Sequence, residues 1–119
     1  MGVNKKYHEF SVIDMNSGWE TLPGYPEGIQ QKILSGALDE INKRGSRTRL
    51  LRFAPGAFTT TQVVHEYWEE VYIVSGDFTI GGKLLPPNSY ACRPPSVYHG
   101  PFKSNGGCLL FEVHYFDPV

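Results

Sequence analysis

The sequence predicts an all-β fold, either an antiparallel sandwich or a barrel, and three observations support this prediction. Short apolar or β-branched runs recur along the chain with no convincing helical periodicity between them. Turn-forming pairs such as Pro55-Gly56, Gly81-Gly82 and Asn105-Gly106 separate these runs. Thirteen Gly and nine Pro among 119 residues, with 13% aromatic residues, fit many short strands joined by tight turns. The length is that of a single domain, residues 1–119.

The strands are expected in the following order. Residues 7–35 should add edge strands, because Tyr7–Ile13 alternates between apolar and polar residues. Ile29–Leu38 has weak helical periodicity and is short enough to be a strand instead. The charged run Asp39–Arg47 reads as a solvated surface loop. Further strands are expected at Thr48–Ala54, Phe58–His65, Glu69–Ser75, Phe78–Ile80, Tyr90–Arg93, Val97–Phe102 and Cys108–Phe116. The Asn105-Gly106 pair predicts a hairpin between the last two.

Composition argues against several classes of partner. Eleven Lys and Arg against twelve Asp and Glu give a net charge of −1 with no basic run, which disfavours nucleic acid as the main partner. No apolar stretch approaches the ~20 residues of a membrane span. The first ten residues have no apolar core after their lysines, unlike a secretory signal. Two cysteines, Cys92 and Cys108, read as buried thiols in a reducing compartment, so we expect a cytoplasmic protein.

Three residues are candidate metal ligands. His65 and Glu69 are four residues apart at the start of an expected strand, and His99 follows the stiff Pro94-Pro95 turn. Two imidazoles and one carboxylate are the ligand set of non-haem iron oxygenases, and the same set suits zinc or manganese. Taken alone, the His-x-x-x-Glu spacing is a weak signal, because such residues are also common as solvent-facing groups.

The surrounding pattern resembles the cupin superfamily. The stretch from Gly56 through His65 and Glu69 to Gly76 is similar to the first cupin signature: Gly, five residues, His-x-His, three or four residues, Glu, six residues, Gly. The stretch Pro94–His99 resembles the core of the second signature, Pro-x-Gly-x-x-His, with a serine at the glycine position.

Residues 48–116 look most like the ChrR-type cupin-like domain. The resemblance implies a small β-barrel, with residues 48–116 as its core and residues 1–35 as an N-terminal extension. It also implies that His65, Glu69 and His99 occupy metal-ligand positions.

One signature histidine is missing. Counting back from Glu69 puts Val63 in its place, whereas counting forward from Gly56 puts Gln62 there, and the extra residue predicts a bulge near 62–64. Three outcomes follow: a three-ligand site with open positions for water and substrate, a site completed by Gln62, or a metal-free pocket.

Further pocket residues depend on which side of its strand each side chain takes. The apolar set Leu109, Phe111, Val113 and Tyr115 is expected to face the core, which leaves Glu112 and His114 outside. The opposite parity would make His114 a fourth ligand or general base. Arg52, which interrupts an apolar run, is a candidate anchor for a carboxylate or enolate oxygen, and an exposed arginine is the alternative. Tyr98, beside His99, is a candidate hydrogen-bond or proton donor at the rim, or a packed residue.

The resemblance implies a metal-dependent enzyme acting on a small oxygen-rich molecule, with iron expected first and zinc or manganese next. A dioxygenase cleaving a diketone- or hydroxyketone-like substrate comes first, because relatives of this cupin branch include such enzymes. The alternatives are a non-redox isomerase, cyclase, lyase or hydratase, and a non-catalytic module that binds a small molecule. Unpaired strand edges further predict a homodimer.

Overall fold

Two antiparallel β-sheets make up the fold. The computed structural model describes residues 3–117, and within them there is no helix, hence none long and apolar enough to cross a membrane. The larger sheet has the strand order β1-β2-β3-β9-β4-β7, and the smaller has the order β6-β5-β8. The strands are β1 (Glu20–Thr21), β2 (Ile29–Asp39), β3 (Arg44–Phe53), β4 (Trp68–Gly76), β5 (Phe78–Ile80), β6 (Lys83–Leu85), β7 (Tyr90–Arg93), β8 (Phe102–Lys103) and β9 (Cys108–Tyr115).

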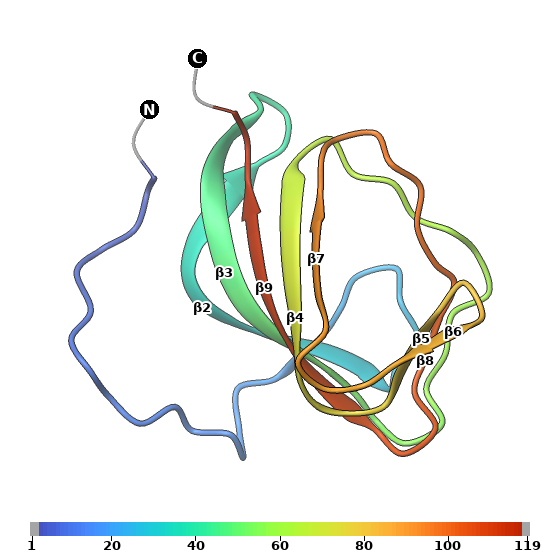
Figure 1. The fold of residues 1–119 in the computed structure, drawn as a ribbon. Helices are drawn as coiled ribbons and strands as arrows, with labels where there is room; N and C mark the ends of the chain where they lie inside the picture. The colour runs from blue at the N-terminus through green and yellow to red at the C-terminus, as the bar shows by residue number, and fades with distance from the viewer. Residues whose placement is uncertain (1–2, 118–119) are drawn as a thin grey trace.

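The long strands of the larger sheet lie side by side, and β5, β6 and β8 gather at one side of it (Figure 1). Apolar side chains from both sheets form one core. Its buried members are Leu22, Ile29, Leu51, Phe53, Val71, Ile73, Phe78, Phe102, Cys108 and Leu110. The predicted all-β architecture of antiparallel strands in a single domain is confirmed.

Most of the expected strands form, with four differences. Ile29–Asp39 is a strand, and β2 and β3 continue through the expected 39–47 loop, leaving residues 40–43 as the turn of a hairpin. Tyr7–Ile13 is not a strand; it runs as an extended arm without a ladder partner among residues 3–117. Phe58–His65 and Val97–Phe102 were expected as strands and are mostly loop. The reason is that these two segments pair at isolated positions and so build no continuous ladder.

Two local predictions were also wrong, one about a hairpin turn and one about a β-bulge. The Asn105-Gly106 turn joins β8 of the small sheet to β9 of the large one, so it changes sheets and closes no hairpin. The Asp77 carboxylate accepts the backbone N–H groups of both turn residues, at 2.7 Å each, which holds the turn in place. The β-bulge expected near residues 62–64 does not form, because no strand passes through them. The register shifts of the larger sheet lie at Ile33/Ser35 and Ile73/Ser75.

Gly76, the last residue of the first signature, ends β4 where two backbones approach closely. Its φ is +87°, and a Cβ there would lie 2.1 Å from the Gly107 carbonyl oxygen. Only glycine fits this position without moving the backbone. The close pairing of the end of β4 with the start of β9 therefore requires the motif glycine.

The expected parity of β9 is reversed. Cys108, Leu110, Glu112 and His114 are buried, whereas the intervening apolar side chains are half-buried on the outer face. Two pairings across the sheet explain this arrangement. Glu112 lies opposite Arg49 of β3, and His114 lies opposite Glu69 of β4, so each buried polar group meets a polar partner inside.

Cys92 differs from the expectation as well: it is exposed, and Cys108 alone is buried. Both thiols are free.

Candidate metal centre

His65, Glu69 and His99 converge on one point. Glu69 is the second residue of β4 and is buried; His65 lies in the segment that leads into this strand, and His99 lies in the loop before β8. One ligand atom from each falls within 4.8 Å of the others. The distance from Glu69 Oε1 to His99 Nε2 is 3.4 Å, and that from Glu69 Oε2 to His65 Nε2 is 3.9 Å.

Backbone pairing holds His99 in place. Its N–H and C=O exchange hydrogen bonds with those of Val63, at 2.9 and 2.7 Å. This pairing joins the two signature segments directly, and the preceding Pro94-Pro95 turn stiffens the approach. His65 and His99 are 34 residues apart in sequence, and paired loops, not a strand ladder, thus bring them together.

The proton of His99 sits on the nitrogen that faces away from Glu69. Its Nδ1 lies 3.0 Å from the Val97 carbonyl oxygen, and because a carbonyl only accepts, Nδ1 must be the donor. When the ring is neutral, Nε2 then bears a lone pair, which faces the Glu69 carboxylate. Two electron-pair donors facing each other fit a cation between them.

His65 is held in its neutral form by burial. Burial lowers the pKa of His65 to about 4, although the Glu69 carboxylate opposes this shift. Its ring stacks on that of Tyr67 with 4.7 Å between centroids and 8° between planes. A neutral imidazole is the form that binds metal ions, so His65 fits a ligand role near neutral pH.

His114 meets Glu69 from the other side, as a hydrogen-bond donor. Arg47 donates to His114 Nδ1 from Nε at 3.1 Å and from Nη2 at 2.7 Å. Arginine has donors only, so Nδ1 is the acceptor and Nε2 carries the proton. Nε2–H points to Glu69 Oε2 at 3.0 Å, with Glu112 Oε1 at 3.3 Å. In this tautomer His114 orients the carboxylate, and its Nε2 has no lone pair for a metal.

A buried ion pair supports the same end of the cavity. Arg49 contacts Glu112 Oε1 through Nε at 2.9 Å and Nη2 at 2.8 Å, and donates to Gln31 Oε1 through Nη1 at 2.8 Å. Burial alone would raise the pKa of Glu112, but Arg49 and His114 more than offset it and hold this pKa well below its usual range. Ligand atoms of Glu69, Glu112 and His114 also lie within 4.8 Å of one another. These atoms already have partners, because Arg49 donates to Glu112 Oε1 and His114 donates to Glu69 Oε2.

The candidate ligands line a cavity of about 40 Å³. At roughly 10–15 Å³ per water centre, this space accommodates about three water molecules. Its polar end carries His65, Glu69, Arg93, His99, Arg49 and Glu112, and its walls include Leu22, Tyr25, Leu51, Phe53, Val71, Phe78, Phe102 and Leu110. The arrangement is a small, mostly apolar chamber with its polar groups at one end, which is typical of a small-molecule site.

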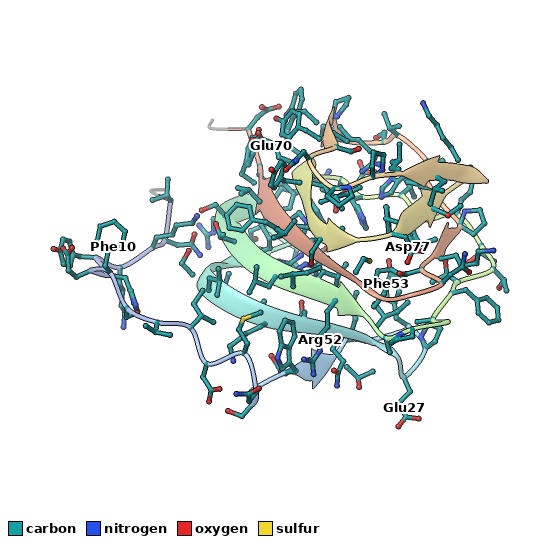
Figure 2. All side chains as sticks on the ribbon, turned by 60° about the horizontal axis from the view of Figure 1, so that its bottom comes forward. Phe10, Glu27, Arg52, Phe53, Glu70 and Asp77 are labelled. Carbon is teal, nitrogen blue, oxygen red and sulfur yellow. The ribbon has the colours of Figure 1, made fainter. Side chains whose placement is uncertain are left out.

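Three other candidate residues lie away from this cavity. Arg52 points to the opposite side of the sheet from its neighbour Phe53 (Figure 2), where its guanidinium lies 4.0 Å from the centre of the Trp19 ring and donates to Gln30. The expectation that Arg52 anchors a ligand in the pocket is therefore wrong, because strand alternation turns it outward once Phe53 faces the core. Tyr98 is 61% exposed and Gln62 is exposed, and neither lines the cavity.

The sequence reasoning missed Arg47 and Arg49 altogether. In β3, each of Arg47, Arg49, Leu51 and Phe53 is two residues from the next. The period-two pattern of a strand therefore places all four side chains on the inner face. This alternation was the signal that could have revealed two inward arginines, and with them the need for inward carboxylates on β9.

Known proteins resemble this chain at the level of the family and of the fold. The model of the ChrR Cupin-like domain matches residues 8–115. None of the curated proteins matches the chain significantly.

Solved structures share the fold at low sequence identity. An RmlC-like cupin from Shewanella frigidimarina is 22% identical, with a TM-score of 0.69, over 96% of this chain and 95% of that one. An acetylacetone dioxygenase from Acinetobacter johnsonii is 16% identical, with a TM-score of 0.69, over 95% of this chain and 76% of that one. The polyketide cyclase RemF from Streptomyces resistomycificus is 15% identical, with a TM-score of 0.68, over 92% and 81%.

At these identities the structural matches establish the fold alone. The family match covers nearly the whole chain and includes both signature segments. The chain belongs to the family of ChrR cupin-like domains.

Proposed function

We propose that this chain is a metal-dependent cupin enzyme, a non-haem iron dioxygenase that cleaves a small diketone- or hydroxyketone-like molecule. The observation that carries the proposal is the convergence of the His65 and His99 nitrogens and the Glu69 carboxylate at the polar end of an otherwise apolar cavity. The similarity to an acetylacetone dioxygenase supports the choice of reaction.

The donor set fits a divalent cation. Two imidazoles and one carboxylate are ligands that suit iron, zinc and manganese, and three protein ligands leave positions open for other molecules. When bound, such an ion supplies Lewis acidity at a carbonyl or enol oxygen and, if it is iron, reactivity toward dioxygen. We propose iron first.

The surrounding residues orient the site. His114 and Arg93 donate to different oxygens of Glu69, at 3.0 Å each, and so fix the direction of its remaining lone pairs. Arg49 keeps Glu112 ionised and pairs with its Oε1. Phe53, Phe78 and the other apolar walls favour the carbon skeleton of a substrate and exclude bulk water.

We further propose that this chemistry takes place in a reducing compartment such as the cytoplasm. The two cysteines are free thiols, and Cys92 is exposed, where an oxidising environment would modify it.

The test is metal analysis followed by dioxygen uptake. Protein purified without a histidine tag is stripped, loaded with Fe²⁺ under nitrogen, and assayed with an oxygen electrode on acetylacetone and related diketones and hydroxyketones. His99→Ala should lose both the iron and the uptake. His8→Ala is the matched control, because His8 is exposed in the N-terminal arm, and it should retain both.

Two other results would redirect the assignment. Turnover under nitrogen by the zinc or manganese form would place the chain among isomerases, cyclases, lyases or hydratases. Failure of the wild-type protein to hold any metal would contradict the enzyme proposal and leave a binding module.

A further inference from the structure

Arg93 occupies a position that a metal ion would compete for. It lies directly opposite Glu69 in the pairing of β7 with β4, so both side chains share the inner face. Its Nη1 donates to Glu69 Oε1 at 3.0 Å. This is the same oxygen that lies 3.4 Å from His99 Nε2. The guanidinium therefore binds the carboxylate oxygen that faces His99, which a cation held between the candidate ligands would also contact.

The charges around the cavity balance before any metal is added. Among the described residues that line it, Arg49 and Arg93 carry two positive charges, and Glu69 and Glu112 carry two negative charges. A divalent cation would leave an excess of two positive charges in a space of about 40 Å³. A buried, uncompensated charge is costly, so the loaded site favours an anion.

Arg93 has hydrogen-bond donors available for such an anion. Within residues 3–117 its guanidinium makes one hydrogen bond, through Nη1, so other N–H groups of the fork remain for a ligand. The side chain is 20% exposed and lines the cavity, and so has room to turn. Arg49, by contrast, is committed to Glu112 and Gln31. A guanidinium fork matches the two oxygens of a carboxylate.

We propose that the ligand of this site is a small oxo acid, a ketone that also carries a carboxylate, and that it binds cooperatively with the metal. Arg93 releases Glu69 to the cation and pairs with the carboxylate of the ligand. The proposal rests on the proposed function and narrows its substrate class. It assigns to Arg93 the carboxylate-anchoring role that Arg52, on the outer face, cannot fill.

The test measures Mn²⁺ affinity by calorimetry, without assaying activity. Metal-free protein is titrated with Mn²⁺ alone, with saturating pyruvate, and with saturating acetoin, which has the same number of non-hydrogen atoms but no carboxylate. Blank titrations without protein correct for Mn²⁺ bound by pyruvate. Pyruvate should tighten the Mn²⁺ Kd about fivefold or more, the lower end of ordinary coupling between sites, and acetoin should not.

Variants of Arg93 separate its charge from its geometry. Arg93→Gln should bind Mn²⁺ alone more tightly than the wild type, because Glu69 loses its competitor, and should lose the pyruvate effect. Arg93→Lys keeps the charge but lacks the fork, so it should retain the weaker Mn²⁺ binding and lose most of the effect. Arg44→Gln, at an exposed arginine, is the matched control and should behave as the wild type.

The outcomes distinguish this inference from the proposed function. An equal pyruvate effect in wild type and Arg93→Gln, or an equal effect of acetoin and pyruvate, overturns the oxo-acid inference and leaves the metal site intact. Absence of Mn²⁺, Zn²⁺ and Fe²⁺ binding in the wild type under all conditions overturns both.

Discussion

Glu69 is the residue on which the candidate site depends. Its Oε1 accepts from Arg93 and its Oε2 accepts from His114, while both oxygens face the imidazoles of His65 and His99. A carboxylate held from two sides is oriented before a metal arrives, which is how hydrogen bonds beyond the ligands tune a metal centre. His99 differs from His114 in the position of one proton, because its Nδ1 donates to the Val97 carbonyl whereas His114 donates from Nε2 to Glu69.

That difference predicts unequal effects of histidine substitutions on metal binding. His99→Ala should abolish stoichiometric metal, because it removes a ligand. His114→Gln should keep one metal per chain with affinity reduced by about 10–100-fold, because it removes only a hydrogen bond to Glu69. Elemental analysis and titration against a chelator measure both quantities. An equal loss in the two variants would mean that His114 is itself a ligand.

His65 makes the metal-free protein sensitive to acid. Its pKa is about 4 when folded, against an ordinary value of 6.5, so the unfolded chain binds more protons between these pH values. The free energy of unfolding should therefore fall as the pH drops from 6.5 to 4, by up to roughly 3 kcal/mol from this group. Urea unfolding of chelator-treated protein across this range should show a shallower decline for His65→Gln, and parallel curves for the two proteins would contradict the assignment.

At this scale the sequence predicted the residues that belong to the signatures and misplaced those that do not. His65, Glu69 and His99 were found because their spacing is tied to the family pattern. Glu112 and His114 were assigned to the outer face because the alternate residues of β9 are all apolar. The rule that apolar residues face the core fails for β9, because its buried inner face carries the polar cluster and its half-buried outer face is apolar.

At the scale of elements, β3 and β9 form the polar end of the cavity as one paired unit. Arg49 and Glu112 face each other across this pair, and their side chains are 8% and 5% exposed. Both side chains are therefore almost entirely removed from bulk water. Removing one member leaves a buried, unpaired charge, whereas removing both removes the problem.

We therefore expect a strongly non-additive response in this pair. Glu112→Leu alone should lower the free energy of unfolding by about 3–5 kcal/mol, and Arg49→Met alone should do the same. The double variant should recover most of that loss. Urea unfolding of the four proteins completes the cycle. Additive losses would show that the two side chains do not stabilise each other.

Sequence patterns identified most strands with continuous ladders, the β2–β3 hairpin near residues 39–47 excepted, and they failed where the chain runs as loop. β4 and β7 were placed within a residue because β-branched and aromatic residues end at clear turn signals. Phe58–His65 has the same β-rich composition, yet it contributes isolated bridges, since a ladder also requires a partner strand in register. Composition reports the fit to a pleated surface, but a partner distant in sequence decides whether the strand forms.

On the scale of the whole molecule, the outer face of the large sheet explains why the outward-facing side chains of β9 are apolar. Leu50, Phe111, Tyr72 and Tyr90 form one row across four strands. Tyr72, Val74 and Tyr90 are 38%, 42% and 61% exposed. Leu50 is buried, so the solvent-exposed part of this face lies on β4 and β7. An exposed apolar patch of this kind is typical of a protein interface.

We accordingly expect a homodimer that packs through this face, with two copies related by a two-fold axis. Light scattering should give twice the mass of the chain. Tyr72→Lys combined with Val74→Lys should give a monomer, because charges at the centre of such an interface lose their water without gaining a partner. Leu84→Lys is the control: Leu84 is 64% exposed in β6 of the other sheet, so the dimer should persist. A wild-type monomer mass, or a dimer that survives both lysines, would mean that this face is not the contact between subunits.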